Sequence, residues 1–541
     1  MFDWEIKFIS NNFNELKDNI LKSKQIADYS NFINPKEPVK YINDFSDEFI
    51  NNVKLAKEIV FESIKNNQPI IIHGDYDADG VISTHIIFST IKNFLKYDHV
   101  YYIIPDRFED GYGLSDKTVQ KILDLVPSQN FLLITVDCGI TSVNQVSFLK
   151  SLGNKVVITD HHHKGEVIPN SDSLIWSDKV VGSTLSWILS LALGNKDSKL
   201  LSLIATATIT DVFPLKDFNR SIVKYGIEIL KTNPFFPFKK LLFFHNIDLK
   251  DVNVYHLGFV IGPRLNSSGR IADADLSVSL LNSQQDSEID KYLNEINLVN
   301  QRRQKITEES ASKFSLNKEN LPKVIIVKDE EFHEGVVGLI ASRLVQNYHR
   351  PALVITQNED FLKGSARSIK GINIIEIIKK FQHLLKGCGG HELAAGFSLE
   401  RENFEEFKTL IESYIDENFD KNYFTKKIIV DSEISDSLVT FETSDFIESL
   451  APFGPGNEEP IFLLKEVTVQ EIKKIGKDKN HLSLLVSKNQ SKFKALYFNF
   501  PEEAGGLYLG QKINLIFKLK KNLFNNNTYL DLHILDIKEI V

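Results

Sequence analysis

The stretch His73-Gly-Asp-Tyr-Asp-Ala-Asp-Gly80 places three aspartates and a histidine between two apolar runs. In an extended segment alternate side chains point the same way, so Asp75, Asp77 and Asp79 are expected to share one face. Carboxylates held that close repel one another unless a cation lies between them. Mg²⁺ and Mn²⁺ prefer carboxylate oxygens, and Mn²⁺ also accepts imidazole. The octapeptide therefore predicts a metal site at the end of a buried strand; an acidic turn without a metal is the alternative.

Two later segments end in the same way. The apolar run 131–136 leads into Asp137, and the run 155–159 leads into Asp160-His161-His162-His163. Buried parallel strands read as continuous apolar runs, and open α/β sheets bind ligands at the carboxyl ends of their strands. Asp211 ends a further apolar stretch, where a helix-capping role is the alternative. Together these segments predict that the polar side chains meet at one edge of a parallel sheet.

The four segments resemble the motifs of the DHH phosphoesterase superfamily, with HGDYDADG at 73–80, VDCG at 136–139, TDHH at 159–162 and the later Asp211. GCGGHELAAGF at 387–397 is similar to the glycine-glycine-histidine motif of the DHH-associated domain. Longer strings narrow the resemblance to the RecJ family of bacterial exonucleases: PDRFEDGYGL at 105–114, GPRLNSSGR at 262–270, HEGVVGLIASRL at 333–344, GSARS at 364–368 and PFGPGNEEPIF at 452–462. These strings are spread over most of the chain.

The resemblance implies a hydrolase that uses two divalent ions, Mn²⁺ or Mg²⁺, with Asp137 bridging them. One ion would be held by His73, Asp77 and Asp137, and the other by Asp79, Asp137, His161 and Asp211. Three neighbours are expected to assist. Asp75 would orient His73 or a water, Asp160 would orient a histidine, and His162 would donate to a phosphate oxygen or shuttle a proton.

A phosphodiester also needs donors for its non-reacting oxygens. Arginine offers a planar bidentate fork for phosphate, and glycines let backbone amides approach closely. We expect Arg107, Arg264 and Arg270 to lie in glycine-bearing loops, with Arg264 also counted as catalytic; surface ion pairs, or a turn at the glycines, are the alternatives. The expected substrate-binding residues are Arg107, Arg264, Asn266, Arg270, Ser365, Arg367, Gly389, Gly390 and His391.

Hydrophobic patterning predicts an α/β protein in five parts. Residues 1–50 form a mixed polar lead, expected to pack on the catalytic domain. From 51 to 290, apolar strands alternate with helical patterns, as in the parallel sheet of a DHH domain. A charged helical linker, 291–320, joins this domain to a second α/β domain, the DHH-associated domain, at 321–424. Short strands at 425–541 predict an all-β barrel, which the resemblance identifies as an OB-fold.

The barrel region carries lysines with interleaved aromatic residues. A single-strand groove uses such residues for phosphate contact and base stacking, whereas a solvated strand face is the alternative. The residues are Lys473, Lys474, Lys477, Lys479, Lys488, Lys492 and Lys494, with Phe493, Tyr497 and Phe498 between or beside them.

Composition limits the class of protein. The chain has 541 residues, 42% hydrophobic and 25% charged, which is typical of a soluble globular protein of three or four domains. Its net charge of −9 argues against coating nucleic acid through bulk positive potential, but it allows a local basic channel. There is no signal-peptide pattern and no apolar stretch of membrane-spanning length. With only Cys138 and Cys388 as cysteines, we expect a cytoplasmic protein without a disulfide framework.

The resemblance implies an exonuclease specific for single-stranded DNA that works 5′ to 3′, releases 5′-mononucleotides and serves recombination and repair. One alternative is a DHH-family phosphodiesterase acting on short RNA or dinucleotides; another is a catalytically inactive DNA-binding subunit derived from this fold. The intact ligand set argues against the inactive subunit, and the barrel argues against a dinucleotide specialist. The expected partners are single-stranded DNA, a single-stranded-DNA-binding protein and a helicase. We expect no membrane association, and we expect the protein to be a monomer.

Overall fold

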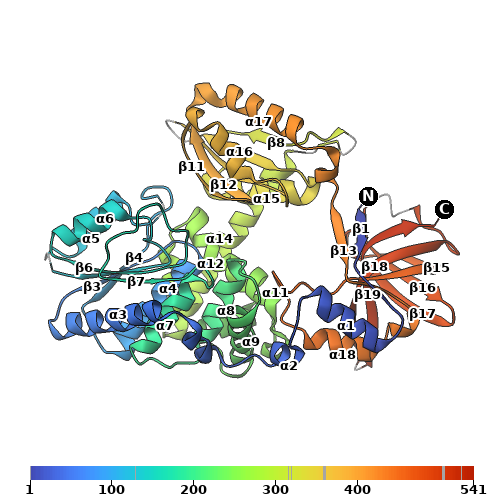
Figure 1. The fold of residues 1–541 in the computed structure, drawn as a ribbon, viewed down its shortest axis with the longest axis horizontal. Helices are drawn as coiled ribbons and strands as arrows, with labels where there is room; N and C mark the ends of the chain where they lie inside the picture. Colours follow the sequence, from blue (N-terminus) through green and yellow to red (C-terminus); the bar gives the residue numbers. More distant parts are fainter. Residues whose placement is uncertain are drawn as a thin grey trace. The chain divides into compact units, whose positions relative to one another are not determined.

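The computed structural model describes residues 2–540 except 112, 128–129, 315, 318–319, 358–360, 502–505 and 526 (Figure 1). Tyr112 of the 105–114 string therefore lies outside the described residues. The chain forms two compact units: residues 36–424 make one, and residues 1–35 together with 425–541 make the other. In the described part of the chain, no helix is both long and apolar enough to cross a membrane.

The first sheet of the 36–424 unit is fully parallel, with the order β4-β3-β5-β6-β7. Alternate residues of β3 enter different cores: Ile70 and Ile72 face one helical layer, and Ile71 faces the other. Both faces are therefore covered, as a continuous apolar strand requires, and the predicted parallel α/β domain is confirmed. The strands are β3 (Ile70–His73), β4 (Val100–Ile103), β5 (Leu132–Val136), β6 (Lys155–Asp160) and β7 (Ser173–Trp176).

The helices around this sheet form two layers. One layer packs α5 (Asp116–Leu125) and α6 (Val143–Ser151) on the sheet. The other contains α3 (Asp47–Lys65), α4 (Ala78–Ser89), α7 (Gly182–Ala192), α8 (Leu200–Thr210), α9 (Asp217–Thr232), α10 (Phe236–Phe244) and α13 (Asp275–Asn282). Because all strands run in parallel, the segments that follow β3, β5 and β6 leave the sheet at the same edge.

Residues 262–270 fold differently from the prediction. They lie in helix α12 (Gly262–Ile271), so Arg264 and Arg270 project from a helix and the expected loop is wrong. Proline stands at the first turn of this helix, where its missing N–H costs nothing and its fixed φ suits the helix. The string's glycines and proline therefore start a helix here.

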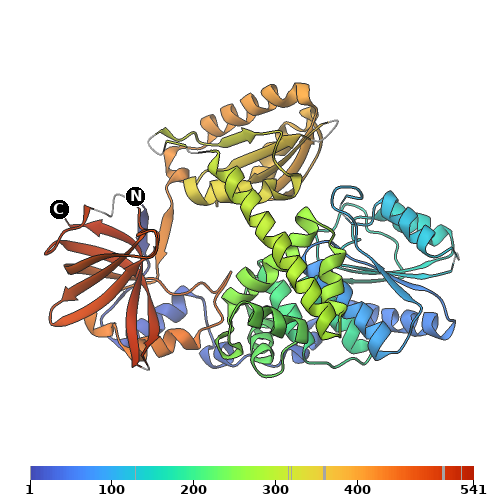
Figure 2. The ribbon, with the colours of Figure 1, turned by 180° about the vertical axis from the view of Figure 1, so that it is seen from behind.

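A long helix, α14 (Asp286–Ser312), links the two sheets of this unit, as Figure 2 shows. It begins and ends earlier than the predicted 291–320. The second sheet is mixed, in the order β11-β12-β10-β9-β8, with only β8 and β9 parallel. Helix α15 (Val337–Tyr348) covers one face, and α16 (Ile374–Lys380) and α17 (Phe404–Asn418) cover the other. The strands are β8 (Ile325–Lys328), β9 (Ala352–Gln357), β10 (Leu362–Arg367), β11 (Leu385–His391) and β12 (Ala394–Leu399).

The other unit contains a closed five-stranded barrel, which confirms the predicted OB-fold architecture. Strand β15 pairs with both β16 and β18, and β17 and β19 complete the ring. Helix α18 (Phe441–Ser449) contributes to the barrel core. The strands are β15 (Phe462–Ile475), β16 (His481–Lys488), β17 (Ser491–Tyr497), β18 (Lys512–Phe524) and β19 (Asn527–Glu539).

Residues 1–35 belong to this barrel unit, so the expectation that the N-terminal lead packs on the catalytic domain is wrong for them. Strand β1 (Asp3–Ile6) pairs in parallel with β13 (Lys427–Val430), and β2 (Ile9–Ser10) pairs with β14 (Ser432–Ile434). Helix α1 (Phe13–Ser23) buries two side chains in the barrel core. Pairing over more than 400 residues of chain depends on main-chain hydrogen bonds, which leave little trace in local sequence.

Candidate metal centre

The octapeptide turns the end of β3 into the start of α4. Asp77 is the N-cap residue of α4, and its Oδ1 accepts the amides of Asp79 at 3.0 Å and Gly80 at 3.1 Å. This cap, favoured by an aspartate at that position, fixes the side chain at the sheet edge. Asp75 is 3% exposed and Asp79 is 2% exposed, so these carboxylates are buried together with little access to water.

A second helix holds Asp79. The two Asp79 oxygens accept the first amides of α7, from Gly182 at 2.6 Å and from Ser183 at 2.9 Å. The positive end of the helix dipole stabilises the carboxylate there. A Cβ on Gly182 would lie 2.4 Å from Oδ1 of Asp137, so only glycine lets α7 come this close.

Asp137 lies at the centre of the acidic cluster. Its backbone is left-handed, with φ of 61°, which is uncommon for a residue other than glycine and aims the side chain back over the strand end. Burial raises the pKa of Asp137 well above its usual value, and Asp79 and Asp77 add to the shift. A cation would remove this repulsion.

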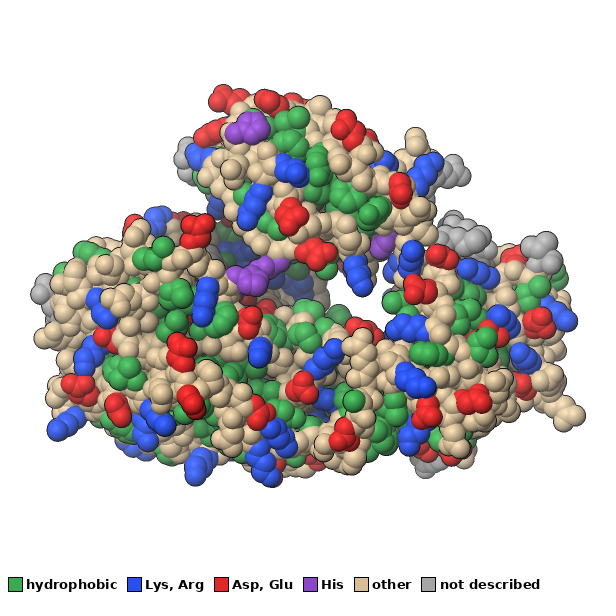
Figure 3. Space-filling view, viewed as in Figure 1, with side chains coloured by type: hydrophobic (Ala, Val, Ile, Leu, Met, Phe, Trp, Pro, Cys, Tyr) green, Lys and Arg blue, Asp and Glu red, His purple; other side chains and the backbone are tan. Residues whose placement is uncertain are grey.

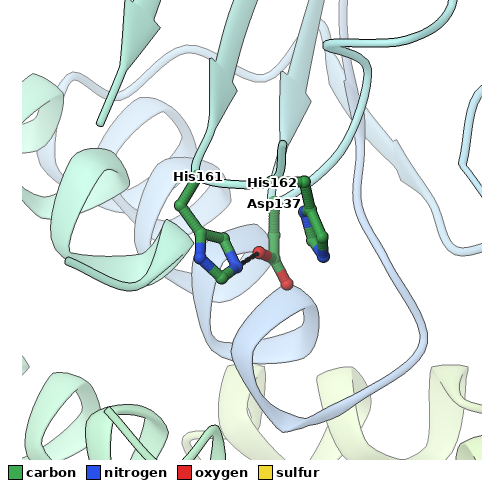
Figure 4. A group of neighbouring side chains, drawn as sticks. All are labelled: Asp137, His161 and His162. Atoms are coloured by element: carbon green, nitrogen blue, oxygen red, sulfur yellow. Dashed lines mark ion pairs between the residues drawn. The ribbon is translucent and has the colours of Figure 1, made fainter. Parts of the chain in front are cut away.

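His161 connects Asp137 to the remaining carboxylates. Its Nε2 lies 3.0 Å from Oδ1 of Asp137, 3.7 Å from Oδ2 of Asp79 and 3.8 Å from Oδ2 of Asp211. Figure 4 shows His161 and His162 on either side of Asp137. Asp211 follows directly after α8, and burial together with Asp79 raises its pKa to about 8.

These side chains form groups that fit two divalent ions. Asp75, Asp77 and Asp137 bring ligand atoms within 4.8 Å of one another, as do Asp79, His161 and Asp211. A third group contains Asp137, His161 and His162. Carboxylate oxygens with one or two imidazoles are the donors that Mg²⁺ and Mn²⁺ accept. Asp137 belongs to the first carboxylate group and lies 3.0 Å from His161 of the second, a position that suits a bridging ligand.

His73 lies at the end of β3 but outside those groups. It is fully buried, and neither ring nitrogen has a hydrogen-bond partner among the described residues. Burial lowers the pKa of His73 to about 4, so the imidazole is neutral at pH 7. A neutral, unpartnered, buried imidazole beside Asp75 and Asp77 suits a metal ligand. The geometry also brings Asp75 into the first carboxylate group, where the sequence suggested only an orienting role.

Asp160 and His162 form a pair beside the cluster. Oδ1 of Asp160 accepts the Nδ1–H of His162 at 2.8 Å and its amide at 3.0 Å, and Oδ2 accepts the Ile140 amide at 2.8 Å. Burial works to raise the pKa of Asp160, but these hydrogen bonds outweigh it and the pKa is lowered. Burial likewise works against the charge on His162, yet Asp160 raises the pKa of His162 to about 9. Asp160 therefore fixes the His162 ring and favours its protonated form.

A cationic group lies near this cluster. Arg107 stacks over the ring of Tyr76 at 5.0 Å, and Nη1 of Arg367 donates to Oγ of Ser365 at 3.0 Å. Burial and the charge of Arg107 lower the pKa of Arg367, and the same two causes lower that of Arg270 to about 10. Neighbouring arginines that lower one another's pKa repel each other, and a bound anion would relieve this repulsion. Figure 3 shows histidines at a hollow in the surface with Lys and Arg side chains behind them.

Helix α15 starts beside this cationic group. A Cβ placed on Gly338, in the first turn of α15, would lie 2.9 Å from Nη2 of Arg367 and 3.1 Å from Oγ of Ser365. This helix has no side-chain cap on its first amides. Amides at a helix start, a hydroxyl and a guanidinium are the donors from which phosphate sites are built.

Two predicted substrate residues instead support the fold. Arg264 donates from Nε to Oδ1 of Asn297 at 2.7 Å and from Nη1 to the Val260 carbonyl at 2.6 Å. The Oδ1 of Asn266 accepts the amide of Ala78 at 2.8 Å, which ties α12 to the start of α4. These contacts favour positioning roles, and the catalytic role expected of Arg264 stays a prediction.

The glycine-glycine-histidine motif lies on β11, with Gly389, Gly390 and His391 exposed. The His391 ring lies 4.9 Å from that of His163, so the second domain approaches the first at the histidine triplet. Sequence reasoning missed Arg303 on α14. Its Nη2 donates to Oδ1 of Asn300 at 2.7 Å, and its charge acts on Arg270. Its charged helical surroundings gave no sign of this.

The parallel sheet with buried carboxylates at its carboxyl edge defines a metal-dependent phosphoesterase of the DHH type. Family models agree: "DHH family, N-terminal domain" matches residues 69–209, "DHHA1 domain" matches 321–417, and "RecJ OB domain" matches 430–536. The chain belongs to the RecJ family of exonucleases, as its curated relatives show.

The single-stranded-DNA-specific exonuclease RecJ of Haemophilus influenzae is 30% identical over 89% of this chain and 89% of its own length. The Bacillus subtilis RecJ is 32% identical over 91% of this chain, which spans 64% of that longer relative. Among solved structures, RecJ from Thermus thermophilus in complex with Mn²⁺ matches with a TM-score of 0.80 and 23% identity, over 100% of this chain and 80% of that one. An exonuclease RecJ bound to manganese matches with a TM-score of 0.59 and 30% identity, over 68% and 95%.

Proposed function

We propose that this chain is an exonuclease specific for single-stranded DNA, which removes 5′-mononucleotides from the 5′ end by two-metal hydrolysis during recombination and repair. The observation that carries the proposal is the position of Asp137 between the Asp75–Asp77 carboxylates and His161 of the second group, beside a half-buried cationic group. The relatives reported above are single-stranded-DNA-specific exonucleases, which supports this substrate.

The residues divide the chemistry between them. The carboxylates and His161 hold two divalent ions, which when bound activate a water and stabilise charge on the phosphorus. Protonated His162, fixed by Asp160, donates to a phosphate oxygen or to the leaving group. Arg270 and Arg107 stabilise the non-reacting oxygens through charge-assisted hydrogen bonds. Tyr76 positions Arg107 by stacking.

The direction of digestion is proposed from the resemblance, and the second sheet offers a feature that supports it. Ser365, Arg367 and the first turn of α15 form an anion pocket near the metal centre. A terminal 5′-phosphate carries more negative charge than an internal phosphodiester, so this pocket favours a 5′ end. Occupation of the pocket would place the next phosphodiester at the metal ions and release one nucleotide at a time.

The barrel is proposed to bind the rest of the DNA strand. Lys492 and Lys494 are exposed on β17, and Phe498, Phe524 and Tyr529 are exposed nearby. Tyr497 is buried in the barrel core, so the prediction that it stacks on bases is wrong, whereas Phe493 packs against that core but stays half-exposed in a surface groove with Lys492 and Lys494. Alternating strand residues face opposite sides, and Tyr497 faces inward with Ala495. The exposed lysines and aromatic rings of the barrel still combine the two kinds of side chain that a single-strand groove needs.

Digestion of one oligonucleotide, labelled separately at its 5′ and 3′ ends, tests the proposal. With Mn²⁺ or Mg²⁺, the 5′ label should leave first as a mononucleotide while the 3′ label stays on a shortening strand. A duplex of the same sequence, with blunt ends, is the control and should persist. Early release of the 3′ label would mean that digestion starts at the 3′ end. Cleavage of dinucleotides without cleavage of longer strands would favour the alternative of a phosphodiesterase for short substrates.

We further propose that the chain acts as a monomer in the cytoplasm, beside a single-stranded-DNA-binding protein and a helicase. Its two cysteines support a reducing compartment, because Cys138 is buried and both are unpaired. The partners are expected because a nuclease that requires single strands depends on proteins that open duplexes and hold the product. Co-sedimentation of the purified chain with each candidate tests this proposal.

A further inference from the structure

Helix α12 packs directly against the turn that carries the first metal ligands. A Cβ on Gly269 would lie 2.2 Å from the carbonyl oxygen of Tyr76, and Oδ1 of Asn266 accepts the amide of Ala78 at 2.8 Å. Tyr76 and Ala78 flank Asp77, the N-cap residue of α4. The main chain of α12 therefore determines where this turn, and with it the Asp77 carboxylate, can lie.

The next residue of the same helix contacts the segment that leads into the anion pocket. A Cβ on Gly335 would lie 1.7 Å from the carbonyl oxygen of Arg270 and 2.8 Å from its carbonyl carbon. Gly335 is buried in the short helix η6 (Glu334–Val336), which runs straight into α15. The first turn of α15 lies beside the pocket residues Ser365 and Arg367. The position of the pocket therefore depends on how closely η6 approaches α12.

Glycine is needed at both contacts because the main chains approach closer than a side chain allows. Ordinary van der Waals contacts of a Cβ begin at 3.4 Å, and the atoms met at both positions are main-chain atoms, which cannot turn aside as a flexible side chain can. Neither Gly269 nor Gly335 has the left-handed backbone that favours glycine. Space, and not backbone conformation, therefore explains glycine at these two positions.

We propose that Gly269 and Gly335 are positioning residues that set the separation between the metal centre and the anion pocket, an inference that rests on the proposed function. Two consecutive residues of one helix, Gly269 and Arg270, contact the two sites, and packed main chains leave little room for either site to shift. A strand whose 5′-phosphate lies in the pocket is then presented to the metal ions at a fixed distance from its end. Helix α12 thus acts as a spacer between recognition and cleavage.

Gly335→Ala in the full chain tests this inference. The added Cβ should push the start of α15 away from α12 by on the order of 1 Å, and a misplacement of that size can cost about 100-fold in rate. Because the pocket residues stay intact, a 5′-phosphorylated strand should still bind as tightly as to wild type in Ca²⁺. With Mn²⁺, kcat for that strand should fall about 100-fold. A 5′-hydroxyl strand does not use the pocket and should keep its rate.

Three other variants make the test specific. Arg367→Ala should raise KM for the 5′-phosphorylated strand, because the pocket loses a donor while the spacing stays. Gly269→Ala should move the turn that carries Asp77, so kcat should fall on both strands. Gly387→Ala, whose Cβ would meet no described atom within 4 Å, is the control and should match wild type. Thermal unfolding of each variant shows whether it is folded.

If Gly335→Ala does not fold, His333→Asn takes its place. The His333 ring lies 5.5 Å from that of Phe108, and its Nδ1 accepts the Gly335 amide at 3.1 Å. Asparagine keeps an acceptor for this amide but removes the ring contact, which should loosen η6 against the first domain. A fall in kcat for the 5′-phosphorylated strand alone would support the spacing role, whereas a fall on both strands or on neither would overturn it.

The inference is overturned if folded Gly335→Ala behaves as wild type, loses rate equally on both strands, or loses binding of the 5′-phosphorylated strand instead of kcat. The proposed function survives each of these results. If wild type cuts no single strand, the proposed function fails. If wild type cuts single strands without preferring a 5′-phosphate, the anion pocket fails, and in both cases the inference fails with it.

Discussion

The two sheets of residues 36–424 share an α/β architecture but gather opposite charges. At the parallel sheet, the first amides of α7 face the carboxylate of Asp79, so the protein itself supplies the anion. At the mixed sheet, the first turn of α15 faces Ser365 and Arg367, which are donors, so the anion must come from a ligand. The same helix-terminus physics therefore suits both the cation site and the anion site that we propose.

Removing the shared carboxylate should break the first site most severely. Asp137→Ala should abolish turnover, because one bridging ligand organises both ions, whereas Asp75→Ala should lose about 10- to 100-fold. Asp137→Asn is a matched variant, since asparagine also tolerates the left-handed backbone. Turnover is measured at saturating Mn²⁺. Equal residual rates for Asp137→Ala and Asp75→Ala would contradict the bridging role.

Both sheets should work without the barrel. A protein of residues 36–424 keeps every proposed ligand and also omits residues 1–35, which would lose their partner strands if only 425–541 were deleted. It should still cut short oligonucleotides but bind long single strands about 100-fold more weakly, with a shallower salt dependence. Binding is measured across a salt series. If the folded 36–424 protein binds long strands as tightly as the full chain does, the barrel does not bind DNA, and docking of another protein becomes its more plausible role.

Arg367→Ala should affect only the anion site. Wild type should cut a 5′-phosphorylated strand faster than a 5′-hydroxyl strand, and the variant should lose most of this preference, about tenfold, with the loss of a charge-assisted hydrogen bond. Initial rates on both substrates measure it. Arg343→Ala, a substitution on α15 outside the pocket, serves as the control. A wild type indifferent to the 5′-phosphate would remove the pocket from the account.

Gly182→Ala should affect the cation site alone. The added Cβ would meet the Asp137 carboxylate at 2.4 Å and push it or α7 aside, which should weaken Mn²⁺ binding about tenfold. Gly387→Ala is the matched control, because its Cβ would meet no described atom within 4 Å. Calorimetric titration of Mn²⁺ into both variants measures the difference. Unchanged Mn²⁺ affinity in Gly182→Ala would show that helix α7 and Asp137 can move apart without disturbing the metal site.

The sheet edge could be predicted because its signal is local. Each apolar run ends in a polar cluster, and parallel strands share their carboxyl ends, so His73, Asp137 and His161 had to be neighbours. Arg270 and Arg264 were misplaced because a glycine and a proline read as loop residues, yet proline also suits a helix start.

What the sequence could not reveal depends on distant contacts. Nothing near Trp4 predicts its hydrogen bond to Oδ2 of Asp536 at 2.8 Å, or the pairing of β1 with β13. The burial of Tyr497 depends on which face of β17 turns to the barrel core, and this is set by pairing with distant strands. Arg303 joins the cationic group only because α14 passes beside α12.

The most direct test of the central claim is the anomalous diffraction of crystals of this protein soaked in Mn²⁺. The account predicts two peaks about 4 Å apart at the carboxyl edge of the parallel sheet, with the Asp137 carboxylate between them. Asp75, Asp77 and His73 should surround one peak, and Asp79, His161 and Asp211 the other. A single peak, or two peaks that do not share Asp137, would contradict it.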